Sequence, residues 1–204
     1  MERLGIFGGT FDPPHLGHLI LASEAVHQLK LDKVLWVLTP YPPHKQHQII
    51  SPIQDRIDMV LAAISDNPCF ELCFVDINRE PPHYAVDTVK IILNMCPPQS
   101  ELVYLIGGDS LANLPTWHNP QYLLQLTQQL GVFRRPGIDI DLYQLEEKIP
   151  DITKKIQWIS APLIDISASY IRLLVSQKGP YRYYLPEKVV TIIETGNLYL
   201  PESE

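Results

Sequence analysis

One stretch near the start of the chain constrains the fold more than any other. A short apolar run, Leu4–Phe7, leads into the segment Gly8–His18, which carries two adjacent glycines, two prolines and two histidines. Apolar residues at helical spacing then continue as far as Lys30. This order predicts a strand, a tight glycine turn and a helix over Leu16–Lys30.

The glycine turn and the helix start together suit an anionic ligand. Because Gly8 and Gly9 lack a Cβ, the main chain can turn sharply there and lie against a ligand. The start of a helix exposes unpaired N–H groups and the positive end of the helix dipole, which favours a phosphate. His15 and His18 are three positions apart, so on a helix they share one face. The segment therefore points to phosphate chemistry, although a plain turn with two surface histidines has the same pattern.

Other ligands fit this segment less well. A catalytic zinc ion usually needs a third protein ligand, and no obvious one lies near His15 and His18. A Walker A loop is excluded because the chain has no G-K-[ST]. The spacing of Gly5, Gly8 and Gly9 does not match G-x-G-x-x-G, and the second predicted strand ends at Thr39 instead of an acidic residue. Hydride transfer from a dinucleotide is therefore disfavoured.

Strand and helix patterns alternate through the rest of the chain, with no internal repeat. The further predicted strands are Lys33–Leu38, Phe70–Val75, Leu102–Ile106, Gly131–Phe133 and Lys155–Ile159. The further predicted helices are Ile53–Ser65, Val86–Met95, Leu111–Leu114, Pro120–Leu130, Leu142–Lys148, Tyr170–Ser176 and Pro186–Thr195. This alternation predicts an α/β fold, a Rossmann-like doubly wound parallel sheet. We expect one domain over residues 1–204, with a core at 1–160 and a small C-terminal helical appendage at 161–204.

The polar or glycine-bearing stretches fall at the carboxyl ends of the predicted strands. They are Gly8–His18, Thr39–Lys45, Gly107–Asp109, Arg134–Arg135 and Ser167–Arg172. Ligands of doubly wound folds bind in the crevice at these ends, so we expect the stretches to converge on one site.

A second cluster of polar groups lies in Ile166–Arg172. Ser167 or Ser169 is suited to cap a helix, and Arg172 then lies one turn inside it. Two hydroxyls and a guanidinium at a helix start can clamp a phosphate, and a plain cap with a surface arginine is the alternative.

Four further side chains have two interpretations each. Asp109 can bind a ribose hydroxyl or a magnesium-bound water, or it can cap a helix. Trp117 and Tyr84 can stack on a ring or pack in the core. Arg134 can hold a phosphate or lie solvated on the surface.

Phosphoryl transfer requires positive groups where charge develops, because positioning and electrostatics carry most of its catalysis. His15 and His18 can donate from Nε2 to phosphate oxygens. Lys45 can supply a point charge and Arg172 a bidentate fork.

Composition excludes several other classes. The net charge of −7 and the pI near 5.5 argue against a general nucleic-acid binder. The three cysteines form no C-x-x-C and no signal peptide is evident, which favours reduced thiols in a cytoplasm. No apolar run approaches the roughly 18 residues of a membrane span.

Two motifs at opposite ends of the chain resemble the HxGH nucleotidyltransferase superfamily. They are G-G-T-F-D-P-P-H-L-G-H near the start and I-S-A-S-x-I-R over Ile166–Arg172. Between them P-P-H-K, I-G-G-D-S, P-T-W-H and R-R-P-G are similar in order and spacing to the bacterial nicotinate-nucleotide adenylyltransferases. The resemblance covers about residues 3 to 200.

The resemblance implies transfer of the adenylyl group of ATP to nicotinate mononucleotide, giving deamido-NAD and pyrophosphate in NAD biosynthesis. It implies that the phosphate of the mononucleotide attacks the α-phosphorus in line, and that Mg²⁺ is carried by the ATP phosphates instead of a protein metal site. The implied catalytic residues are His15, His18, Lys45 and Arg172. The implied ATP-binding residues are Gly8, Gly9, Thr10, Phe11, His15, His18, Gly107, Asp109, Ile166, Ser167, Ser169 and Arg172. The implied mononucleotide-binding residues are Thr10, Lys45, Tyr84, Trp117 and Arg134.

One departure concerns the choice of acceptor. The family usually has Ser-Tyr-Thr before this helix, whereas the chain has His83-Tyr84-Ala85. His83 can supply a positive charge to the nicotinate carboxylate or simply be exposed. Nicotinamide mononucleotide or another small phosphate is thus the alternative acceptor, and a nucleotide-binding sensor without turnover is the non-enzymatic alternative. The sequence leaves a homo-oligomer open and indicates neither a nucleic-acid nor a membrane partner.

Overall fold

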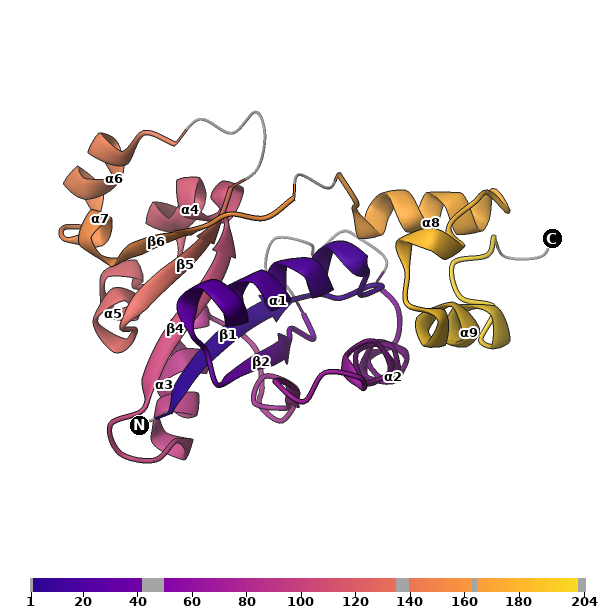
Figure 1. Ribbon diagram of the computed structural model, residues 1–204, viewed down its shortest axis with the longest axis horizontal. Coiled ribbons are helices and arrows are strands. Elements are labelled where there is room, and N and C mark those ends of the chain that lie inside the picture. The colour runs from indigo at the N-terminus through magenta and orange to yellow at the C-terminus, as the bar shows by residue number, and fades with distance from the viewer. Residues whose placement is uncertain (1, 42–49, 135–139, 163–164, 202–204) are drawn as a thin grey trace.

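The computed structural model describes residues 2–41, 50–134, 140–162 and 165–201. Its centre is a six-stranded sheet in the order β3-β2-β1-β4-β5-β6, with every neighbouring pair parallel (Figure 1). The strands are β1 (Arg3–Gly9), β2 (Lys33–Leu38), β3 (Phe70–Cys73), β4 (Glu101–Gly107), β5 (Gln129–Phe133) and β6 (Ile156–Ile159). This is the strand order of the Rossmann fold, and it confirms the predicted fold class.

Helices cover both faces of the sheet. On one face lie α1 (Leu16–Leu29) and α2 (Ile53–Ile64). On the other lie α3 (Ala85–Met95), α4 (Gly108–Asn113), the 3₁₀ turn η2 (Leu114–Thr116), α5 (Pro120–Leu126), α6 (Leu142–Lys148) and α7 (Ile152–Lys155). Each layer buries its own hydrophobic cluster against the sheet, so the sheet is apolar on both sides.

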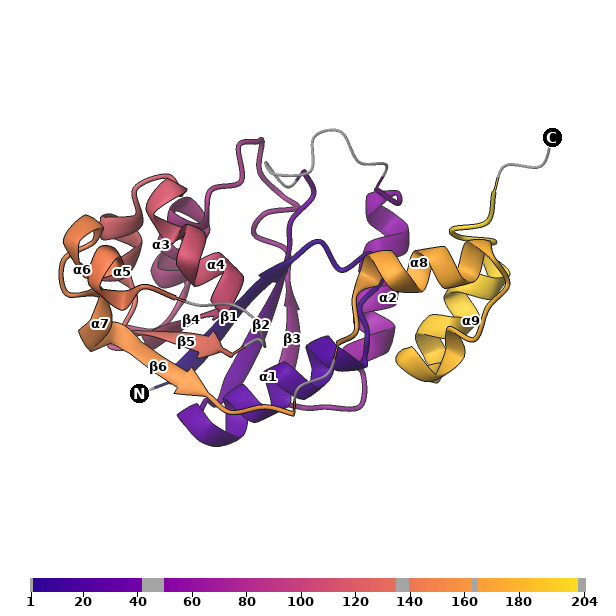
Figure 2. The same ribbon diagram turned by 90° about the horizontal axis from the view of Figure 1, so that it is seen from above.

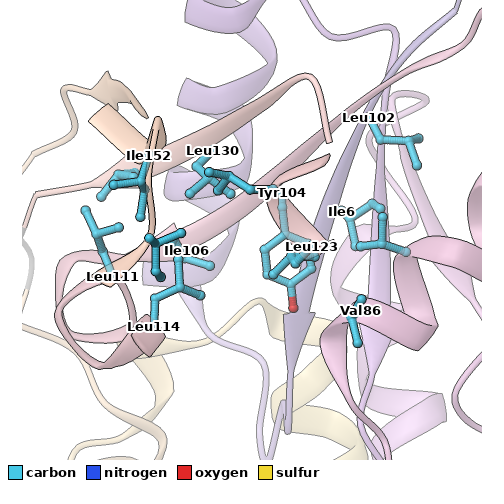
Figure 3. Packing of buried hydrophobic residues seen from close by; sticks show 14 of the residues in the cluster. Ile6, Val86, Leu102, Tyr104, Ile106, Leu111, Leu114, Leu123, Leu130 and Ile152 are labelled. Atoms are coloured by element: carbon cyan, nitrogen blue, oxygen red, sulfur yellow. The ribbon is translucent and has the colours of Figure 1, made fainter. Parts of the chain in front are cut away.

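The side chains of β4 show this division directly. Leu102, Tyr104 and Ile106 point to the layer of α3–α7. Val103 and Leu105 point to the layer of α1 and α2. Figure 3 shows the first group packed with side chains of the helices, and the hydroxyl of Tyr104 is the only oxygen among the labelled residues. Successive residues of a strand face opposite sides, so one strand anchors both layers.

The C-terminal part adds α8 (Ala168–Ser176), the 3₁₀ turn η3 (Arg182–Tyr184) and α9 (Glu187–Thr195). These segments bury a third cluster with Met59 of α2, through residues that include Ile171 and Val189. In both views they lie beside α2, at the end of the molecule opposite α6 and α7 (Figures 1 and 2).

The helix predicted over Pro120–Leu130 is wrong at its end. The helix α5 stops at Leu126, and Gln129 and Leu130 pair with Val103 and Tyr104 of β4. Leu130 is fully buried at this position, so sheet pairing outweighs the local helical pattern.

No described helix is long and apolar enough to cross a membrane.

Candidate functional site

A cleft of about 700 Å³ opens at the carboxyl ends of β1, β4 and β5. Since β1 and β4 are neighbours whose following helices cover opposite faces, this is the switch point where ligands of such sheets bind. The predicted residues that line the cleft are Gly8, His15, His18, Gly107, Asp109, Trp117, Arg134, Ile166, Ser167 and Ser169. The fold thus brings the two end motifs into one cleft.

His15 and His18 form a stacked pair at the start of α1. Their ring centroids are 3.7 Å apart and the ring planes meet at 26°. The backbone N–H of His15 donates a 3.2 Å hydrogen bond to Nδ1 of His18, which leaves Nε2–H as the donor of that ring. The edges of Phe7 and Phe11 pack against His18. Packing and one hydrogen bond therefore fix this imidazole in the cleft at the positive end of a helix.

Gly17 allows the two motifs to approach each other. A Cβ built on Gly17 lies 3.0 Å from Nδ1 of His15 and 3.7 Å from Cβ of Ile166. The oxygen of Ser167 accepts a 3.2 Å hydrogen bond from the N–H of Tyr170 and so caps α8. The cap was predicted for Ser167 or Ser169, and the structure assigns it to Ser167. Two helix starts, those of α1 and α8, thus face one cleft.

Arg172 connects the motifs at the side of this cleft. Its Nη1 donates a 2.6 Å hydrogen bond to the carbonyl of Asp12, and its Nη2 donates a 3.3 Å bond to the hydroxyl of Ser169. In this structure the guanidinium, which the sequence predicts as a phosphate clamp, holds the loop that follows β1 to the start of α8.

The buried carboxylate of Asp12 accepts hydrogen bonds from two distant segments of the chain. Its Oδ1 accepts a 2.7 Å hydrogen bond from the hydroxyl of Tyr199, and its Oδ2 accepts a 3.2 Å bond from the N–H of Ser51. Burial, and next the negative charge of Asp12, raise the pKa of Tyr199 far above its ordinary value, so its hydroxyl stays protonated as a donor. The chain after α9 is thereby attached to the loop of the first motif.

Arg56 braces the same loop from the side of α2. The side chain is buried, and its guanidinium donates to the carbonyls of Ser51, Thr10, Thr39 and Pro40 at 3.0–3.3 Å. These carbonyls belong to the segments that follow β1 and β2 and to the start of α2. Burial lowers the pKa of Arg56, since a charge is costly to desolvate.

Aromatic rings form the far wall of the cleft. The edge of Trp117 meets Tyr104 at a centroid distance of 6.1 Å. Arg134, which lines the cleft, lies over the ring of Trp158 at 4.9 Å in a cation–π contact. The ring of Tyr84 stacks on His118 at 4.2 Å instead of lining the cleft.

Several predicted site residues do not line the cleft with side chains. Phe11 is buried in the core beside Phe7 and Trp36, so any contact with a nucleotide would involve its main chain. Gly9, Thr10, Tyr84 and Arg172 also lie outside the lining of the cleft. Lys45 falls outside the described residues.

His83 is buried, so it is not the exposed residue that the sequence allowed. Its Nε2 lies 3.3 Å from the carbonyl of Arg79. The neighbouring carboxylate of Asp76 accepts bonds from Arg79 at 2.9 Å and Thr88 at 2.7 Å. This network fixes the loop before α3, and the ring of His83 does not reach the described lining of the cleft.

Metal ligands are sparse in this region. Asp109 lies in the first turn of α4, and Asp165 lies across the cleft. Among the described residues no group of three His, Cys, Asp or Glu side chains could hold a metal ion.

Sequence reasoning missed Arg56, Tyr199 and Tyr104, and gave Asp12 no role. Arg56 did carry a signal, because it shares the apolar face of its helix with Ile53 and Val60. A charged residue on a buried face needs partners. The Tyr199–Asp12 bond spans 187 positions and has no local signal.

The chain is similar to known proteins over most of its length. The cytidylyltransferase-like family model matches residues 6–174. A probable nicotinate-nucleotide adenylyltransferase of Thermomicrobium roseum is 42% identical over 199 residues, covering 98% of this chain and 92% of the relative. The nicotinate-nucleotide adenylyltransferase of Bacillus subtilis is 37% identical over 199 residues, covering 98% and 99%.

A solved structure shares the fold. The Plasmodium falciparum nicotinic acid mononucleotide adenylyltransferase complexed with NaAD superposes with a TM-score of 0.79 and 18% identity. The match covers 98% of each chain, so the C-terminal helices are part of the common architecture.

Proposed function

The chain belongs to the nicotinate-nucleotide adenylyltransferase family, and we propose that it transfers the adenylyl group of ATP to nicotinate mononucleotide, giving deamido-NAD and pyrophosphate. One observation carries the proposal: the stacked pair of His15 and His18 at the start of α1 shares its cleft with the start of α8. Two helix starts with an oriented imidazole donor suit a polyphosphate.

In the proposed reaction a phosphate oxygen of the mononucleotide attacks the α-phosphorus of ATP. A new P–O bond forms as the bond from the α-phosphorus to the β-phosphate bridging oxygen breaks, and the electron pair leaves with pyrophosphate. No protein nucleophile takes part. His18 donates from Nε2 to the phosphate oxygens on which charge grows, and its fixed orientation avoids reorganisation during the step.

The proposed binding groups divide between ATP and the mononucleotide. Gly107 and Asp109 would hold the ribose of ATP. The proposed phosphate-binding residues are His15, Lys45, Ile166, Ser167, Ser169 and Arg172, together with the main chain of Gly8, Gly9, Thr10 and Phe11. The mononucleotide would contact Thr10, Lys45, Tyr84, Trp117 and Arg134. Mg²⁺, bound by ATP and water, would neutralise charge on the leaving pyrophosphate.

The test is release of pyrophosphate from ATP with purified full-length protein. Nicotinate mononucleotide should support release and form deamido-NAD in equal amount, as measured by chromatography. Reactions with CTP in place of ATP and with nicotinamide mononucleotide in place of the nicotinate form serve as controls. Absence of release with ATP and nicotinate mononucleotide would overturn the proposal.

A further inference from the structure

One polar group in the cleft is not used by the proposed mechanism. Tyr104 lies in the middle of β4, packed among Ile6, Val86 and Leu123, and its side chain is only 8% exposed (Figure 3). In the described part of the chain its hydroxyl makes no hydrogen bond, although the residue lines the cleft. The ring is buried, but the hydroxyl oxygen is accessible from the cleft, where a ligand can reach it.

The position of Gly8 shows where the hydroxyl points. Gly8 is exposed at the carboxyl end of β1, directly beside β4. Among the described residues, its two neighbours in the chain aside, a Cβ built on Gly8 would have one heavy atom within 4 Å, the hydroxyl oxygen of Tyr104 at 3.5 Å. The described residues therefore leave the space over Gly8 open, and this oxygen borders it. A ligand that approaches the glycine must come near the hydroxyl.

Trp117, the second neighbour of Tyr104, indicates which part of a ligand lies beside the Tyr104 hydroxyl. The ring of Trp117 meets Tyr104 edge-on at 6.1 Å, and both residues belong to the layer of α3–α7. The His15–His18 pair stands on α1, on the other face of the sheet. Tyr104 therefore lies on the side of Trp117, away from the imidazoles.

The hydroxyl is suited to donate. Burial, with a smaller effect from the charge of Asp76, raises the pKa of Tyr104 well above its ordinary value. The group thus stays protonated at every pH where the enzyme would work. A protonated hydroxyl donates a stronger hydrogen bond to an anionic oxygen than to a neutral oxygen.

We infer that the Tyr104 hydroxyl is a substrate-binding group that donates a hydrogen bond to an anionic oxygen of the mononucleotide. The inference rests on the proposed function and adds a determinant to it. The oxygen belongs either to the phosphate or to the ring carboxylate of the mononucleotide. A comparison of nicotinate mononucleotide with nicotinamide mononucleotide as substrate distinguishes these two cases. Bound substrate supplies a partner for this hydroxyl, which bonds to none of the described residues.

The experiment compares Tyr104→Phe with the parent protein. The ring stays, so the core keeps its packing, and loss of an unpaired hydroxyl should leave the thermal midpoint equal or higher. We expect KM for nicotinate mononucleotide to rise about tenfold, equivalent to about 1.4 kcal/mol, with KM for ATP changed less than about twofold. Tyr143→Phe, which removes an exposed hydroxyl outside the cleft lining, is the matched control.

Nicotinamide mononucleotide identifies the bonded oxygen. If the partner is the ring carboxylate, the variant should lose more with the nicotinate than with the nicotinamide form. If the partner is the phosphate, both acceptors should weaken equally. Unchanged KM for nicotinate mononucleotide in an active Tyr104→Phe protein, or an equal rise in KM for ATP, would overturn the inference. Inactivity of the parent protein would instead contradict the proposed function.

Discussion

The hydroxyl of Tyr199 donates a 2.7 Å hydrogen bond to the carboxylate of Asp12. The bond joins the turn after α9 to the loop between β1 and α1. Arg172 donates to the carbonyl of the same aspartate at 2.6 Å. Two groups of the C-terminal part thus hold the loop that precedes the His15–His18 pair.

Tyr199→Phe tests the first of these bonds. The substitution leaves Oδ1 of the buried Asp12 without this donor, which should lower the free energy of unfolding by about 1–3 kcal/mol. Urea denaturation measures the change. Tyr183→Phe, at a side chain that is 92% exposed, is the control and should be neutral. Equal midpoints for the two variants would show that the bond does not stabilise the fold.

The same bond predicts a dependence on alkaline pH. The pKa of Tyr199 is raised in the folded protein above its ordinary 10.0, so the folded state keeps a proton that the unfolded state loses. Its contribution is fully present below pH 10 and is lost as pH rises above that value, at up to about 1.4 kcal/mol per pH unit. The raised pKa of Tyr104 acts in the same direction. Unfolding free energies at pH 9, 10 and 11 should fall less steeply for Tyr199→Phe than for the parent, and parallel slopes would contradict the assignment.

The third prediction concerns Arg56 and its effect on stability and activity. Its guanidinium donates to four backbone carbonyls, and a lysine ammonium cannot reach them with the same planar fork. Arg56→Lys should therefore lower the free energy of unfolding by roughly 2–4 kcal/mol and also lower activity, because the loop of Thr10 loses a brace. Arg182→Lys, at an exposed ion pair with Glu194, should leave both properties unchanged. A fully active and stable Arg56→Lys protein would reject this role.

Local patterns were sufficient to predict the layers of the fold. The buried runs of β1, β2 and β4 and the helical spacing of α1 and α3 all carry period signals that survive in the folded protein. The strand predicted over Gly131–Phe133 is two residues shorter than β5, because Gln129 and Leu130 gain their partners only from β4. Pairing between distant segments leaves no trace in a window of the sequence.

The same distinction applies to the site. The two end motifs predicted a shared cleft, since carboxyl ends of parallel strands must meet. The motifs could not show which residues hold the loop between β1 and α1 in place. Arg56 bonds to backbone carbonyls and Tyr199 bonds to the carboxylate of Asp12, and only the fold brings these groups together. Local sequence also could not show that Arg172 bonds to the Asp12 carbonyl.

Substitutions at two glycines should affect different properties, substrate affinity at Gly8 and stability at Gly131. Gly8→Ala places a methyl group in the cleft, where the Tyr104 hydroxyl lies at an ordinary contact distance of 3.5 Å. Gly131→Ala instead meets Leu105 at 2.6 Å and Leu29 at 2.9 Å in the core. We expect Gly8→Ala to melt normally and lose substrate affinity, and Gly131→Ala to lose about 1–3 kcal/mol of stability. The reverse pattern in calorimetry and steady-state kinetics would contradict the location of the cleft.

His18 provides the most direct test of the chemistry. The backbone N–H of His15 orients its ring so that Nε2–H can donate to the reacting phosphates, an interaction that should strengthen as charge grows. His18→Ala should lower kcat by about 10²–10³-fold with a smaller change in KM for ATP. His27→Ala, at an exposed position in the last turn of the same helix, controls for the loss of an imidazole from α1. Pyrophosphate release at saturating substrates measures both variants. A drop in kcat of less than about threefold for His18→Ala would mean that this imidazole does not stabilise the transition state, and the role would pass to His15 or to the main chain of the glycine turn.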